Sequence, residues 1–105
     1  MKIFTIKIHD TDHQLKEPIN IDEDVSYSKG KQMFILSNDD FKLLALCRDK
    51  EMGRKIMQEE INMMIDSYLF EPNYVVSDNA IKLREKIKMY TSDIFPTDEQ
   101  AADGN

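Results

Sequence analysis

The chain has 105 residues, of which 41% are hydrophobic and 32% are charged. This is enough for one globular domain with its own core. Twenty acidic and 14 basic residues give a net charge of −6, which argues against broad nucleic-acid binding through phosphate contacts. No apolar run approaches the roughly 18 residues of a membrane span, and a single cysteine excludes an internal disulfide. We expect a cytoplasmic protein that folds without a metal, a cofactor or a disulfide.

The N-terminal third of the chain predicts two strands. Apolar and polar residues alternate over residues 4–8, as in a half-buried strand. The polar segment 9–17 is typical of a loop. Alternation returns over residues 19–27, but Glu23 falls on the apolar side, so we expect this second strand to be interrupted or bulged.

The middle of the chain predicts a β-hairpin that leads into a long helix. Residues 33–36 and 41–47 are apolar runs on either side of a polar turn at residues 37–40. From Lys50 the apolar period changes from two to about 3.6. Asp49 is a suitable N-cap. The helix should end near Phe70, because the proline at position 72 disfavours helical geometry in the residue before it.

A second helix is predicted after Ser77, its expected N-cap, with apolar residues spaced three and four apart up to Tyr90. The short links between strands favour antiparallel pairing. The expected fold class is therefore α+β, with a mainly antiparallel sheet of three or four strands packed against one long helix and a second helix near the C-terminus. We expect a single domain over residues 1–95 and a disordered acidic tail over residues 96–105.

No catalytic residue is predicted. The densest group of potential metal ligands is the run from His9 to His13, which includes Asp10 and Asp12. A zinc site would require the two histidines to converge, whereas their spacing suits a helix and the segment predicts a loop. Cys47 shares its apolar parity with residues 41, 43 and 45, which is typical of a buried small side chain. We therefore expect a protein that is not an enzyme, and a metal-dependent enzyme is the less favoured alternative.

Two features are candidate partner-binding surfaces. The first is an acidic pole between residues 9 and 24, where acidic residues outnumber basic ones six to one. The second is the methionine-rich long helix, whose apolar arc is broader than one stripe, so that either internal packing or a partner must cover it. The residues expected to contact a partner are Asp10, Asp12, Asp22, Glu23, Asp24, Met63 and Phe70.

A family resemblance adds to this interpretation. The segment Leu46-Cys47-Arg48-Asp49-Lys50-Glu51 combines the end of a strand, a short polar turn and the start of a helix with acidic residues in it. Residues 61–69 form an apolar helix end. This order, over roughly residues 33–87, resembles the HicB-like antitoxin domain. The family's glycine-containing turn before the helix is missing here. The remaining residues leave no room for an appended DNA-binding module, so the resemblance implies protein binding rather than operator binding.

The sequence thus favours a small non-enzymatic interaction or inhibitor protein, such as a HicB-like antitoxin or a phage or mobile-element inhibitor. A protein partner is expected, a homodimer is possible, and neither direct nucleic-acid binding nor membrane association is expected. The alternative is a nucleic-acid mimic, in which carboxylates imitate phosphates and occupy the basic groove of another protein. That alternative requires the acidic residues to share one surface.

Overall fold

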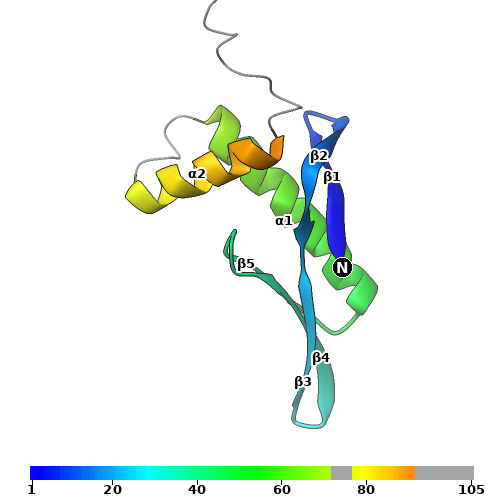
Figure 1. The fold of residues 1–105 in the computed structure, drawn as a ribbon. Helices are drawn as coiled ribbons and strands as arrows, with labels where there is room; N and C mark the ends of the chain where they lie inside the picture. The colour runs from blue at the N-terminus through cyan, green and yellow to red at the C-terminus, as the bar shows by residue number, and fades with distance from the viewer. Residues whose placement is uncertain (72–76, 92–105) are drawn as a thin grey trace, which may run out of the picture.

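The computed structural model describes residues 1–71 and 77–91. Within them the chain forms five strands and two helices, so the predicted α+β class is confirmed (Figure 1). All strand pairs are antiparallel. The elements in chain order are β1 (Lys2–Ile8), β2 (Thr11–Asn20), β3 (Asp22–Ser28), β4 (Lys31–Asn38), β5 (Leu43–Cys47), α1 (Lys50–Phe70) and α2 (Asp78–Thr91).

The strands are divided between two sheets rather than gathered in one. β1 pairs with β2, and a separate sheet has the order β3-β4-β5. Only Ile21 lies between β2 and β3, so one extended path runs through both sheets (Figure 1). At this junction the Ile21 N–H donates to the Met1 carbonyl at 2.7 Å, and the Met1 amine donates to the Ile21 carbonyl at 3.1 Å. These two bonds extend the β1–β2 ladder up to the start of the second sheet.

The predicted loop over residues 9–17 is wrong, because β1 and β2 form a hairpin with a two-residue turn. Ile8 pairs with Thr11, and the intervening His9 and Asp10 have φ angles of 50° and 65°. A type I′ turn needs positive φ at both of these positions. The pairing register then shifts between Ile3 and residue 5. This irregularity disturbs the alternation of β2, so the period-two signal of a strand is absent from the sequence.

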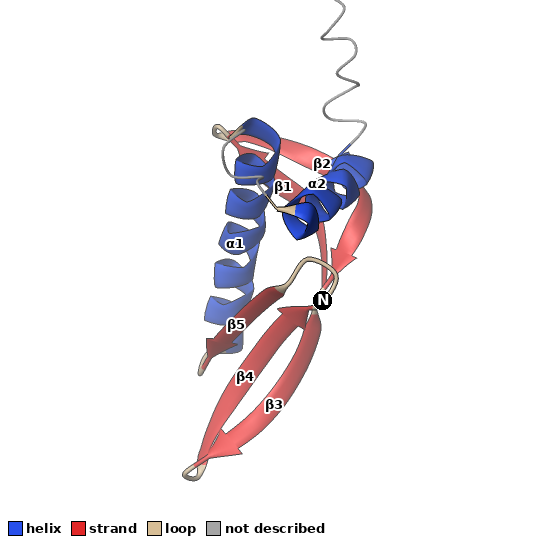
Figure 2. Ribbon diagram, turned by 90° about the vertical axis from the view of Figure 1, so that its left-hand side faces the viewer, coloured by secondary structure: helices blue, strands red, loops and turns tan. Residues whose placement is uncertain are grey.

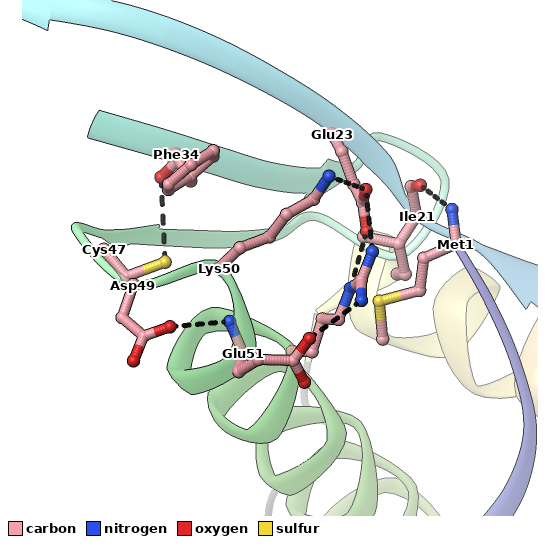
Figure 3. Close-up of polar contacts among 9 residues, drawn as sticks. Met1, Ile21, Glu23, Phe34, Cys47, Asp49, Lys50 and Glu51 are labelled. Atoms are coloured by element: carbon pink, nitrogen blue, oxygen red, sulfur yellow. Dashed lines mark hydrogen bonds and ion pairs between the residues drawn. The ribbon is translucent and has the colours of Figure 1, made fainter. Parts of the chain in front are cut away.

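The strand predicted over residues 19–27 is interrupted, but at Ile21 between β2 and β3 and not at Glu23. β3 pairs with β4 in continuous register from Asp22 to Ser28. Glu23 lies on the apolar parity because it faces α1, where basic side chains bind it (Figure 3). The turn that follows has positive φ at Lys29 and Gly30.

The turn between β4 and β5 depends on a buried amide. β4 extends to Asn38, so the turn lies two residues later than predicted. The Phe41 N–H donates to Asn38 Oδ1 at 2.7 Å, and Asn38 Nδ2 donates to the Asn20 carbonyl, also at 2.7 Å. One side chain therefore satisfies the turn backbone and joins it to the end of β2, which is how a buried polar group is accommodated.

Helix α1 packs across both sheets (Figure 2). Its buried residues are Gly53, Met57, Ile61 and Ile65, which are spaced four apart and so lie on one face. They meet core residues of both sheets, such as Ile6 from β1 and Leu36 from β4. The predicted N-cap is confirmed, because the Glu51 N–H donates to Asp49 Oδ1 at 3.0 Å.

Helix α2 packs against β2 and closes the other side of the first hairpin. Its predicted cap is confirmed, since the Ala80 N–H donates to Ser77 Oγ at 3.1 Å. Ile87 is buried, and Tyr90 meets the ring of Phe41 edge-on at a centroid distance of 5.1 Å. The expected tail over residues 96–105 lies outside the described residues, and the division at residue 95 stays a prediction.

Gly53 is required for the close approach of α1 to the second sheet. A Cβ at this position would collide with Cys47 Sγ and would lie 3.1 Å from Leu36 Cδ1. We expect Gly53→Ala to lower the free energy of unfolding by about 1–3 kcal/mol, the usual cost of overpacking, although alanine favours helix by about 1 kcal/mol. Chemical denaturation measures this effect. Removing Sγ with Cys47→Ala should reduce the loss, and an equal loss in both backgrounds would contradict the contact.

Ile61 is fully buried at the centre of the α1 stripe. We expect Ile61→Ala to lower the free energy of unfolding by about 2–5 kcal/mol, because it leaves a cavity between helix and sheets. The matched control is Lys55→Ala, at an exposed position of the same helix, which should change stability by less than about 0.5 kcal/mol. Similar denaturation midpoints for the two variants would show that this face of α1 is not the core face.

Candidate interaction surfaces

The outer side of α1 carries a line of exposed apolar side chains. Met52, Met63 and Phe70 are 52%, 64% and 43% exposed. They are separated by 11 and 7 residues, close to three and two helical turns, so they lie on one stripe about 27 Å long. We call these three residues the outer stripe. It lies on the side of α1 opposite the buried residues, and it is the clearest apolar surface on a described helix.

The outer stripe contains two of the residues predicted from the sequence, Met63 and Phe70, and one that the sequence reasoning missed. Met52 had the signal needed to find it, because it lies 18 residues before Phe70, which is five helical turns. Phe70 also contacts the first hairpin, with its ring 5.4 Å from that of His9. The stripe therefore ends against the β1–β2 turn.

The structure does not bring the acidic residues onto one surface. Asp10 and Asp12 lie at the turn end of the first hairpin, where Lys7 approaches Asp12 at 3.9 Å. Asp22 and Asp24 lie on β3, beyond the ten residues of β2. At about 3.3 Å per residue, the two pairs are separated by about 30 Å along the chain path.

Glu23 is oriented away from its exposed neighbours and towards α1. It accepts hydrogen bonds from Arg54 Nε at 3.1 Å and Arg54 Nη2 at 3.3 Å, and Lys50 Nζ lies 3.2 Å from its Oε1. The Arg54 bond is the largest of the interactions that lower the pKa of Glu23, while partial burial opposes it. Its carboxylate therefore joins β3 to the first turn of α1 (Figure 3) and is not a free contact for a partner.

The two histidines do not form a metal site with their neighbouring acids. His9 Nε2 approaches Asp66 Oδ1 at 3.4 Å at the end of α1, while His13 lies inside β2 opposite Ile6. Over residues 1–71 and 77–91, no group of three or more potential ligands converges. Cys47 is buried, as its parity predicts, and its thiol approaches the Phe34 carbonyl at 3.9 Å.

A groove lies where α1, α2 and the β4–β5 turn meet. Its volume is about 790 Å³, and both charged and apolar side chains line it. Met63 forms part of its wall, together with Glu60 of α1 and Lys82 and Lys86 of α2. Lys86 approaches Asp40 at 3.8 Å. The groove thus borders the outer stripe and is lined by charges of both signs.

Comparison of the chain with family models, with curated proteins and with solved structures gave no match. The resemblance to HicB-like antitoxins therefore stays a prediction. Within the described ranges, no helix has both the length and the apolar character needed to cross a membrane.

The Glu23 cluster gives stability a defined pH dependence. Arg54 holds the pKa of Glu23 below its ordinary value of 4.5 in the folded protein, so the ion pair stabilises the fold above that value. This contribution is lost as the pH falls from about 4.5 through the lower folded-state pKa. We expect Glu23→Gln to lower the melting temperature at neutral pH and to flatten its decline in acid. Asp24→Asn, on the opposite face of β3, is the control, and an equal flattening in it would contradict the assignment.

Proposed function

We propose that the chain is a small non-enzymatic protein-interaction module of the inhibitor type, and that the outer stripe of α1 contacts its partner. The observation that carries this proposal is the alignment of three large apolar side chains, each more than two-fifths exposed, on one line of a helix. Scattered single apolar residues are normal on a protein surface. An aligned set on a rigid helix is instead the arrangement by which a helix enters an apolar groove of another protein.

Methionine suits this role for a physical reason. Its unbranched, polarisable side chain adapts to the shape of a partner, which is why it is common on binding surfaces. Two of the three residues of the outer stripe are methionines. Charged residues accompany the stripe: Asp66 lies beside it, and Glu59, seven residues after Met52, lies on the line itself between Met52 and Met63. HicB-like antitoxins and phage or mobile-element inhibitors are the classes of protein in which we place such a module.

The nucleic-acid mimic is the weaker proposal because of geometry. A mimic must present its carboxylates as an array that matches a run of phosphates. Here the two exposed acidic pairs lie about 30 Å apart along the chain path, and Glu23, between Asp22 and Asp24, binds Arg54. An apolar contact on α1 needs no such array.

The outer stripe is tested by placing a charge in its centre. We expect Met63→Glu to weaken partner binding by about 30-fold or more, because an interface centre commonly contributes at least about 2 kcal/mol per anchor residue. The measurement is affinity capture from the native host, followed by titration of the captured protein. Met89→Glu is the matched control, since Met89 is 70% exposed but lies on α2. Capture that survives Met63→Glu unchanged would contradict this surface.

The same captured partner separates the two proposals. If carboxylates made the contact, neutralising Asp22 and Asp24 to asparagine would slow association and reduce its dependence on salt. We expect this double variant to bind at the wild-type rate, with an unchanged salt dependence. A partner that requires both carboxylates and tolerates Met63→Glu would establish the mimic instead.

A further inference from the structure

The free edges of the described strands differ in how they are protected. A free edge presents unpaired N–H and C=O groups, and proteins normally cover it or place charges on it. The edge of β1 is covered by α1, because Gln58 Nε2 donates to the Thr5 carbonyl at 2.9 Å and the Lys7 N–H donates to Asn62 Oδ1 at 2.9 Å. The opposite edge strand of the second sheet, β3, carries the charges of Asp22, Glu23 and Asp24.

β5 lacks the charges of β3 and the side-chain hydrogen bonds that cover β1, although α1 packs against it. It is the last strand of the order β3-β4-β5 and is paired on one side only (Figure 2). Its sequence is Leu-Leu-Ala-Leu-Cys, and among the described strands it is the one without an acidic or basic side chain. Some described side chains form hydrogen bonds with the backbone of a strand. In each case that strand is β1, β2 or β4. The flanking charges, Lys42 and Arg48, lie outside the strand.

The exposed side of β5 is apolar as well. Leu43, Ala45 and Cys47 face the core, whereas Leu44 and Leu46 are 61% and 58% exposed on the face away from α1. The neighbour of Leu46 on β4 is Ile35, which is half-buried on the same face. An open edge thus coincides with an uncovered apolar sheet face.

We infer that two copies of this chain pair through β5, antiparallel about a two-fold axis at Ala45, to form one six-stranded sheet. The axis places Leu44 of one copy opposite Leu46 of the other and Ala45 opposite itself. The strand is therefore complementary to its own reverse, which a two-fold interface requires. The four exposed leucines become adjacent on one face, where cross-strand apolar pairs stabilise a sheet.

Charge favours a second copy at this edge over the other edge of the sheet. Each copy carries a net charge of −6, so two copies repel one another wherever acidic surfaces meet. Pairing through β3 would bring Asp22 and Asp24 of both copies together. Pairing through β5 keeps these acids at the two far ends of the six-stranded sheet. This surface is distinct from the outer stripe of α1.

The test is the molar mass of the purified chain in solution, measured by light scattering or sedimentation. We expect a dimer for the wild type and a monomer for Leu46→Lys, because the axis sets each introduced charge in the apolar interface. Val25→Lys is the matched control and should remain a dimer, since Val25 is 49% exposed on the other edge strand. Circular dichroism of each variant confirms that the fold is intact.

A charge pair tests the register. L44K and L46E in the same chain place opposite charges across the axis at both ends, so this double variant should dimerise again, with an affinity that falls as salt is added.

A monomeric wild type, or a dimer that survives Leu46→Lys, would overturn the inference. A dimer that L46K breaks and the charge pair does not restore would overturn the antiparallel register and with it the proposal. A monomer that loses a foreign partner through L46K would replace the second copy with another protein's strand. Only the Met63→Glu result bears on the outer stripe, so the two proposals can fail separately.

Discussion

The rest of the structure depends on the contact between the buried stripe of α1 and the two sheets. Neither sheet encloses a core alone: the two-stranded β1–β2 hairpin is marginally stable in water, and the three-stranded sheet needs a covering element for its apolar face. α1 covers both, and its residues Met57, Ile61 and Ile65 are almost completely buried. Its first turn reaches the second sheet closely enough that only glycine fits at position 53. One helix thus joins two separate sheets into a single packed unit.

The polar contacts around this core orient the helix rather than supply most of the stability. Glu23 binds Arg54 and Lys50 from β3, and Gln58 binds the free edge of β1. Partly exposed ion pairs contribute little energy, but Arg54 and Gln58 are four residues apart and so lie on the same flank of α1. They attach that flank to β3 and to β1, which fixes the rotation of the helix about its own axis. That rotation decides which residues lie outside: it places Met52 and Met63 away from the buried face, with Phe70 against the β1–β2 turn.

The two proposed surfaces follow from this single orientation. With α1 on one face of the β3-β4-β5 sheet, Leu44 and Leu46 stay exposed on the other face, and Met52 and Met63 stay exposed on the outer side of the helix. The helix presents adaptable apolar side chains, which suit a partner whose shape differs from its own. The sheet edge presents backbone groups and a sequence that matches its own reverse, which suits an identical strand. A dimer formed through β5 would present two outer stripes to its partners.

The sequence by itself determined the local elements whose signals are short-range. The caps Asp49 and Ser77, the 3.6-residue period from Lys50 to Phe70 and the burial of Cys47 depend on neighbouring residues, and each was predicted correctly. β2 was missed because a register shift against β1 disturbs its alternation, and such a shift involves residues distant in sequence. The sequence also placed Met63 and Phe70 on a broad apolar arc but grouped the acidic residues into one pole. Only the tertiary structure separated Asp12 from Asp22, turned Glu23 towards Arg54 and left β5 at an edge, because each depends on how the two hairpins pack against α1.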